Sequence, residues 1–237
     1  VNIARPCWRV RDGGEIGCFL ELHIEQGPVL ESTGTGIGVV DSIAGLRRYR
    51  FEARGTRAHA GAAPMEGRND ALVKAAEFVT GVNRLARRHD CRATVGCMQV
   101  DGGGAAIVPG AVSGTLDLRA GNDDTLDRFE DHLAGFDITI TRQARKPAAA
   151  ADSRLMDAIE AACDEAGAGW RRLTSFAGHD ARSMALVAPM AMLFVPSRDG
   201  VSHAPDEFTP DAACVLGARF LLSALLGIDA IDPADGG

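Results

Sequence analysis

The clearest periodic pattern lies in the middle of the chain. Tyr49, Phe51 and Ala53 alternate with charged residues, which is the period of a half-buried strand. Apolar residues at helical spacing follow from Leu72 to Ala86. Further patterns predict strands over residues 93–100, 111–119 and 137–142, and a helix from about residue 123. The order β-α-β-β-α-β is typical of a ferredoxin-like sandwich.

The segments on either side of this module predict a separate α/β unit. A buried strand is expected over residues 18–23 and another strand over 37–43. After an alanine-rich linker, the chain predicts helices over 153–166 and 179–186, a buried strand over 190–195 and a last helix over 211–226. We therefore expect an α/β domain that is interrupted by a ferredoxin-like module. The predicted domains are residues 1–44, 45–146 and 147–237.

Composition narrows the classes of function. Hydrophobic residues make up 46% of the chain and charged residues 24%, as in ordinary soluble globular proteins. The net charge of -7 argues against a nucleic-acid partner. We find no apolar stretch of about 18 residues and expect no membrane span. The six cysteines form no C-x-x-C pair, so we expect a reduced, cytoplasmic protein.

Three glycine-rich segments concentrate the polar residues that could carry chemistry. E-L-H-I-E-Q-G at 21–27 places His23 at the end of a predicted strand, where α/β proteins hold ligands. H-A-G-A-A-P-M-E-G-R-N-D begins at His59, and F-V-P-S-R-D-G-V-S-H-A-P-D-E at 194–207 contains His203. A single histidine is most often a hydrogen-bonded structural residue. The combination of the three segments therefore carries the argument.

These segments, together with G-H-D-A at 178–181 and L-D-L-R at 116–119, give the chain a family resemblance. From about residue 19 to 225 it resembles the N-carbamoyl-L-amino-acid hydrolases and allantoate amidohydrolases, which are dinuclear metal amidohydrolases. The resemblance implies hydrolysis of a linear amide C–N bond in a carbamoyl or ureido substrate. It also implies that the α/β domain is part of a metallo-exopeptidase-like domain and that the ferredoxin-like module is its dimerisation or lid domain. The resemblance further implies a homodimer and two divalent ions, zinc or manganese, in each intact active site.

The resemblance implies a metal or catalytic role for three histidines. His23 and His203 match metal ligands, and a neutral imidazole suits zinc or manganese. His59 matches a lid-domain histidine that reaches the partner subunit's active site and stabilises the oxyanion.

Three further residues match substrate contacts of the family. Gln26 resembles a substrate-binding glutamine, and Gly200 resembles a backbone contact to the substrate carboxylate. Arg119 resembles the arginine that clamps this carboxylate, a task that suits a planar guanidinium.

A structural interpretation stays open for several of these motifs. Arg119 ends a predicted strand, where an exposed arginine is commonly a solvated charge. Arg68 and Asp70 are interpreted as a pair that caps the following helix. His179 and Asp180 are interpreted as the start of a helix near the site, without a catalytic role.

The chain departs from the family pattern in two respects. We find no His-x-Asp and no Glu-Glu motif, which in the family supply the bridging aspartate and the general base. We therefore expect that the N-terminal part of the family is absent. Ala106 stands where the family has an asparagine that holds the substrate's carboxylate end. Losing a hydrogen bond to a charged group costs about 1.5–3 kcal/mol.

Two hypotheses of different classes follow. The first is a metal-dependent amidohydrolase, and an aminopeptidase of the same clan is disfavoured by E-L-H-I-E-Q-G. The second is an inactive, truncated homologue that keeps dimerisation and part of the substrate site. With two recognisable ligands, His23 and His203, we expect the isolated chain to bind metal weakly. We also expect it to show no measurable hydrolysis.

Overall fold

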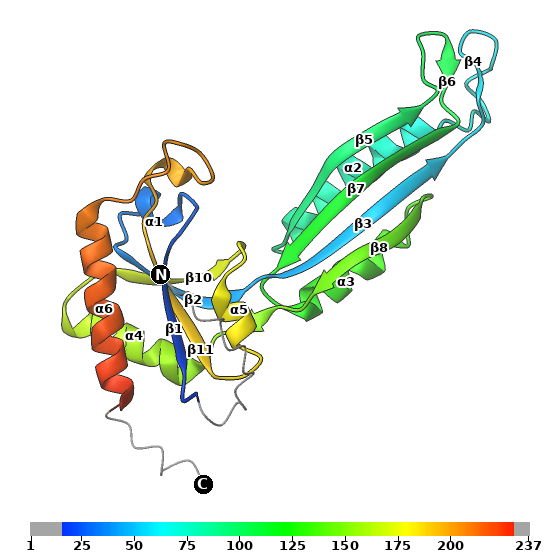
Figure 1. Ribbon diagram of the computed structural model, residues 1–237. Helices are drawn as coiled ribbons and strands as arrows, with labels where there is room; N and C mark the ends of the chain where they lie inside the picture. Colours follow the sequence, from blue (N-terminus) through cyan, green and yellow to red (C-terminus); the bar gives the residue numbers. More distant parts are fainter. Residues whose placement is uncertain (1–15, 230–237) are drawn as a thin grey trace, which may run out of the picture. The chain divides into compact units, whose positions relative to one another are not determined.

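The computed structural model describes residues 16–229, so residues 1–15 and 230–237 lie outside the described part of the chain. The chain divides into two compact units, which are coloured by sequence in Figure 1. Unit 1 contains the residues up to Ile43 and those from Ala150 onward, and unit 2 is Ala44–Ala149. Each unit is described by itself.

Within the described residues, unit 1 is built on a five-stranded mixed sheet in the order β1-β11-β2-β10, with β9 also paired to β2. β1 runs parallel to β11, β11 antiparallel to β2, and β2 parallel to β10. The strands are β1 (Phe19–Ile24), β2 (Ile37–Ile43), β9 (Ala149–Ala150), β10 (Trp170–Ser175) and β11 (Met190–Val195). The parallel pair β1 and β11 brings segments that are far apart in sequence side by side.

The helices of unit 1 define which face of this sheet is the core. α4 (Ser153–Glu165) and α6 (Asp211–Asp229) pack against the sheet through a cluster that includes Leu193 and Val195. Leu22 of β1 packs against the same cluster. Because side chains alternate along a strand, Glu21 and His23 point to the opposite face. Two short helices, α1 (Val29–Ser32) and α5 (Asp180–Met184), follow the polar segments of the sequence.

The predicted strand over 190–195 is confirmed as β11, whose six residues are all buried because strands flank it on both sides. The prediction of a buried strand over 18–23 is wrong in one respect. β1 is half-buried along its whole length, since β11 is its only paired neighbour among the described residues. β10 was not predicted.

The sequence has no unbroken apolar stretch of about 18 residues, but one helix is apolar enough on average to match the length and composition of a membrane span. In α6, the window Asp211–Ile228 has 18 residues and a mean hydropathy of 1.7, which is enough by length and composition alone. Glycine, alanine and serine interrupt the larger apolar residues here, so the stretch is not apparent as an apolar run. One face of α6 packs on the sheet, and Val215, Leu222 and Leu226 on α6 are exposed.

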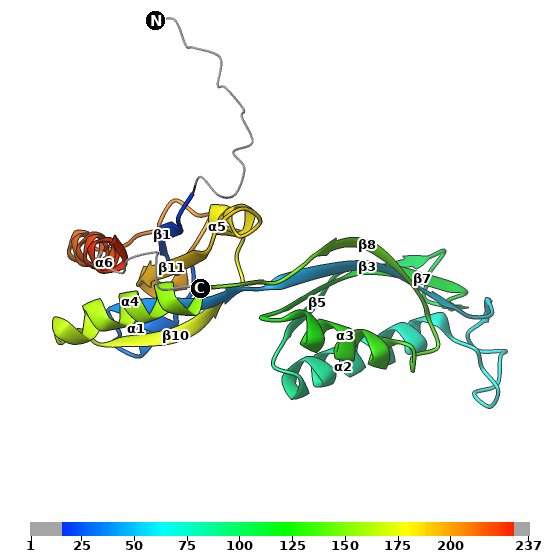
Figure 2. The ribbon, with the colours of Figure 1, turned by 90° about the horizontal axis from the view of Figure 1, so that it is seen from below.

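Unit 2 contains a four-stranded antiparallel sheet in the order β5-β7-β3-β8. Its strands are β3 (Gly45–Arg54), β5 (Arg92–Asp101), β7 (Ala111–Ala120) and β8 (Thr139–Lys146). The helices α2 (Ala71–Arg88) and α3 (Asp123–Leu133) lie on the same side of this sheet (Figure 2). Phe51, Phe78 and Phe129 lie in the core between the two layers.

The predicted strands and helices of this module are confirmed, with one shift. The last strand was expected to end at residue 142, but β8 continues to Lys146 because its pairing with β3 continues to Leu46. Asp70 caps α2 as predicted, accepting hydrogen bonds from the backbone N–H groups of Leu72 and Val73. Two short strands, β4 (Ala58–His59) and β6 (Ile107–Val108), pair with each other and were not predicted.

Candidate functional site

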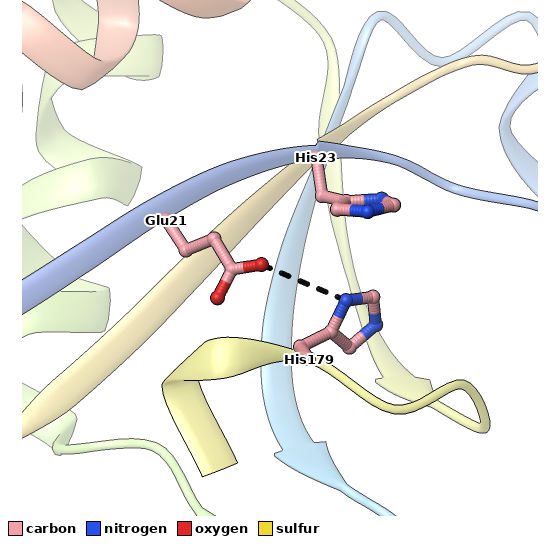
Figure 3. Close-up of side chains that lie close together, drawn as sticks. All are labelled: Glu21, His23 and His179. Carbon is pink, nitrogen blue, oxygen red and sulfur yellow. Dashed lines mark ion pairs between the residues drawn. The ribbon is translucent and has the colours of Figure 1, made fainter. Parts of the chain in front are cut away.

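Three side chains with metal-binding chemistry meet on the face of the unit 1 sheet opposite α4 and α6. Glu21 and His23 come from β1, and His179 directly precedes α5. One ligand atom from each residue lies within 4.8 Å of the others. Figure 3 shows the Glu21 carboxylate facing the imidazole of His179, with the His23 ring beside them. The ring centroids of His23 and His179 are 4.7 Å apart.

Glu21 connects β1 to α5 through its two carboxylate oxygens. The backbone N–H of Ala181, in the first turn of α5, donates to Glu21 Oε2 at 2.7 Å. The other oxygen, Oε1, lies 3.7 Å from Nδ1 of His179, which is too long for a hydrogen bond. Glu21 therefore fixes the start of α5 and keeps one oxygen directed at the imidazole.

His179 is held from one side only. Its side chain is 0% exposed, and its Nε2 is hydrogen-bonded to Ser175 Oγ at 2.6 Å. Among the described residues, its Nδ1 has no hydrogen-bond partner although it is buried. Burial, with smaller contributions from His23 and Arg182, lowers the pKa of His179 to about 4. The ring is therefore neutral near pH 7 and has a nitrogen lone pair to offer.

The hydrogen bond of His23 defines its tautomer. Nδ1 lies 2.8 Å from the carbonyl oxygen of Ile24. A carbonyl oxygen can only accept, so Nδ1 carries the proton and Nε2 of the neutral ring carries the lone pair. This arrangement suits a metal-binding histidine, in which one ring nitrogen is held by a carbonyl group.

Gln26 and Gly200 lie where the polar segments 21–27 and 194–207 of unit 1 contact each other. The backbone N–H of Gln26 donates to Ser197 Oγ at 3.0 Å, and its side-chain amide donates to Ser202 Oγ at 2.9 Å. Gly200 has φ of 65°, and a Cβ there would lie 2.8 Å from the nitrogen of Pro28. The close approach of the two segments therefore requires glycine at this position.

His203 lies on the surface of the second of these segments. It is exposed and has φ of 58°, and its backbone N–H donates to Glu207 Oε2 at 2.9 Å. This bond, with one from Ser202 and smaller electrostatic contributions from His203 and His23, holds the pKa of Glu207 below its usual value. Among the described residues, the ligand atoms that lie within 4.8 Å of one another come from Glu21, His23 and His179. This group therefore contains His23 but not His203.

His59 is the exposed last residue of β4 in unit 2 and directly precedes a turn. Its Nδ1 accepts hydrogen bonds from the backbone N–H groups of Gly61 at 3.1 Å and Ala62 at 3.2 Å. Nδ1 is therefore unprotonated, and the neutral ring carries its proton on Nε2. Arg68 donates to the carbonyl oxygens of Ala60 and Ala63 in this turn, instead of forming the predicted pair with Asp70.

Arg119 lies on β7 of unit 2 in a fixed arrangement. Its Nε donates to Asp117 Oδ1 at 2.8 Å, and Arg48 Nε donates to Asp117 Oδ2 at 2.9 Å. Burial opposes the shift, but the hydrogen bonds from Arg119 and Arg48 hold the pKa of Asp117 below its usual value. Arg119 is thus an ion-paired, half-buried residue, which is more ordered than the solvated charge considered above.

A mixed α/β sheet that presents two imidazoles and a carboxylate on one face has the ligand types of a metallohydrolase. The fold and these side chains together define a candidate metal centre. The chain belongs to the family described as Peptidase family M20/M25/M40, whose model matches residues 3–227.

Several proteins similar to this chain are named amidohydrolases. The chain is 37% identical to an N-carbamoyl-L-amino-acid amidohydrolase of Paenarthrobacter aurescens, over 92% of this chain and 56% of the relative. It is 34% identical to an allantoate amidohydrolase of Bacillus subtilis, over 89% and 54%. A solved amidase of the hydantoinase/carbamoylase family from Burkholderia multivorans matches with a TM-score of 0.82 and 37% identity, over 90% and 55%. The chain spans about half the length of these relatives.

Proposed function

We propose that the protein is a metal-dependent amidohydrolase that cleaves the linear amide C–N bond of an N-carbamoyl amino acid or an allantoate-like ureido acid. The observation that carries this proposal is the match of about nine-tenths of the chain to amidohydrolases for N-carbamoyl-L-amino acids and allantoate. The metal-binding chemistry of Glu21, His23 and His179 supports it.

The residues present fit a divalent ion. The donors are a lone pair on His23, the unpartnered buried Nδ1 of His179 and one oxygen of Glu21. Nitrogen and oxygen ligands of this kind suit zinc or manganese. We assign His23 and His203 as ligands in the family site, which holds two ions when complete. When bound, such an ion supplies Lewis-acid chemistry and lowers the pKa of water.

The remaining residues bind and orient the substrate. His59 donates from Nε2–H to the oxyanion, because its Nδ1 is already an acceptor for the turn. Arg119, held in place by Asp117, clamps the substrate carboxylate. Gln26, whose amide nitrogen donates to Ser202, contacts the substrate through its carboxamide oxygen and its second N–H. Gly200 contributes a backbone contact to the carboxylate.

Substrate hydrolysis is tested with two proteins, the 237-residue chain and the same chain fused behind the N-terminal half of the Paenarthrobacter aurescens relative. Ammonia release is measured with zinc or manganese from N-carbamoyl-L-amino acids, allantoate and ureidoglycolate. The fused protein is expected to turn over one of these substrates and the chain alone none. Ala106→Asn is expected to lower KM by about 10-fold or more, because it restores a hydrogen bond to a charged group.

The controls separate the two candidate functions. His203→Ala in the fused protein is expected to abolish turnover, whereas His132→Ala, on the surface of unit 2, is expected to leave it unchanged. A fused protein that folds and still releases no ammonia from any of the three substrates would rule out the amidohydrolase. The alternative, an inactive truncated homologue that keeps dimerisation and partial substrate binding, would then stand.

We also propose that unit 2 is the ferredoxin-like lid domain and forms a homodimer. Its strand order supports the ferredoxin-like assignment, and β5 is an edge strand of the described sheet with exposed Met98. Val73 on α2 is also exposed. A two-fold interface is self-complementary, so a single such patch suffices. The five described cysteines are free thiols, which supports a cytoplasmic location.

The assembly is tested by light scattering at micromolar concentration. The expected mass is about twice 24.9 kDa, because two copies pair through α2 and β5. Val79→Asp on α2 is expected to shift the mass to that of one chain. Val215→Asp on α6 is the matched control and is expected to leave the dimer intact. A wild-type mass of one chain would contradict the proposal.

A further inference from the structure

We infer that Glu21, His23 and His179 form a three-ligand site for one divalent transition-metal ion, zinc by preference, held entirely within unit 1. The inference assigns His179 as a ligand, although the sequence suggested only a helix start. It requires neither His203 nor the proposed amidase activity.

The strongest argument is how each side chain is anchored. Glu21 uses Oε2 for the backbone N–H of Ala181, His23 uses Nδ1 for the carbonyl of Ile24, and His179 uses Nε2 for Ser175. In each side chain, one of the two possible ligand atoms is hydrogen-bonded to the protein, and the other is left to bind an ion. Metal-binding histidines and carboxylates show this pattern, because the outer partner fixes the ring or carboxylate orientation. Three side chains from two separate segments share it here.

The distances fit an ion better than direct contact between the side chains. Oε1 of Glu21 and Nδ1 of His179 are 3.7 Å apart, too far for a hydrogen bond. Two ligands of one tetrahedral ion, each about 2.0–2.2 Å from it, lie about 3.4 Å from each other. A small movement would therefore accommodate an ion. It would also give a partner to His179 Nδ1, which is buried and has none among the described residues.

The helix-start interpretation does not explain the position of the His179 ring. His179 is the N-cap residue of α5, yet its side chain makes no capping hydrogen bond. The backbone N–H of Ala181 is capped by Glu21 instead. The start of α5 therefore does not require an imidazole at position 179.

The ligand set predicts the character of the site. Two neutral imidazoles and one carboxylate are the protein ligands of several zinc hydrolases, which keep a fourth position open. One carboxylate against a doubly charged ion leaves the site with a net positive charge. Such a site would bind an oxygen of an anionic small molecule, a carboxylate or a ureido acid. The earlier expectation of weak metal binding counted two ligands and did not include Glu21 or His179.

The test uses the 237-residue chain, stripped of metal with a chelator and titrated with Zn²⁺ by calorimetry and with Co²⁺ by visible absorption. One ion per chain is expected, with the intense Co²⁺ bands of a four-coordinate site. His179→Gln and Glu21→Gln can keep their bonds to Ser175 and Ala181, so they remove the ligand and spare the fold. Loss of a residue that only hydrogen-bonds a metal ligand typically weakens metal binding by about 10–100-fold. Each of these two variants is expected to weaken Zn²⁺ binding by more than that. Ser175→Ala is expected to fall within that range.

His203→Ala is the matched control and is expected to leave the affinity of the chain unchanged. Circular dichroism checks the fold of every variant, and His179→Ala provides a second removal of the ligand. Wild-type chain that binds no ion overturns the inference. So does a folded His179→Gln variant with wild-type affinity, or loss of binding in His203→Ala. None of these readouts uses hydrolysis, so a failure here is distinct from a failure of the proposed function.

Discussion

His23→Ala is expected to remove tight ion binding from this chain and to lower turnover of the fused protein by about 10³-fold or more. The reason is that His23 belongs to both proposed ligand sets, the one with His203 and the one with Glu21 and His179. Metal catalysis supplies several kcal/mol of transition-state stabilisation. Each 1.36 kcal/mol is a tenfold change in rate, so losing the ion removes several orders of magnitude.

The measurements are Zn²⁺ affinity in the 237-residue chain and kcat with ammonia detection in the fused protein. His132→Ala is the matched control, because His132 is an exposed histidine of α3 in the other unit. The comparison with His203→Ala is informative as well, since that variant should lose turnover and keep the ion of the isolated chain. A His23→Ala chain with wild-type Zn²⁺ affinity would remove His23 from both ligand sets.

Lowering the pH from 6.5 to 4 is expected to cost the ion-free chain about 3 kcal/mol of unfolding free energy through His179 alone. The pKa of this histidine is about 4 in the folded chain, against an ordinary value of 6.5. The unfolded chain therefore binds the proton first as the pH falls, and stability declines across this window. The stability that the neutral His179 ring contributes is fully present above pH 6.5 and is lost as the pH falls to 4. Below pH 4 it does not change further.

Urea unfolding at several pH values, with a chelator present, measures this contribution. Carboxylates also titrate in this range, so the quantity to read is the difference between wild type and His179→Gln. That difference is expected to change by about 3 kcal/mol between pH 6.5 and 4. His132→Gln is expected to follow the wild type at every pH. Parallel curves for wild type and His179→Gln would show that the ring is not buried as a neutral group.

The sequence predicted unit 2 well because its sheet is covered on one face. Alternation along β3, with Tyr49 and Phe51 buried between charged residues, reports such a sheet directly. β10 was missed because W-R-R-L-T-S has no such alternation, and its only paired neighbour in the described sheet is β2. β1 was predicted as buried because its apolar residues indicate burial, but the pattern does not show how many strands flank it. The pattern of residues along a strand shows which face of the sheet is buried. Whether the strand lies at the edge of the sheet depends on the strand order, which the pattern does not show.

The candidate site was predictable only in part for a similar reason. His23 follows from its motif, and Glu21 two residues earlier shares its face because strand side chains alternate. His179 was interpreted as a helix start, which is correct. Its position beside His23 depends on α5 lying against β1, a contact between segments that are distant in sequence. No local pattern carries that information.

The two connections between the units bear on how proteins of this kind evolve by recombination. The chain leaves unit 1 after Ile43 and returns at Ala150. The ends of unit 2 are neighbours, because Leu46 is paired with Lys146. Within unit 1, the backbone N–H of Ala151 donates to the carbonyl of Asp41 at 2.9 Å. Recombination that exchanges the segment 44–149 between homologous genes would replace His59 and Arg119 together and leave Glu21, His23 and His179 in place. The residues proposed for substrate binding in unit 2 and those proposed for metal binding can therefore be inherited separately.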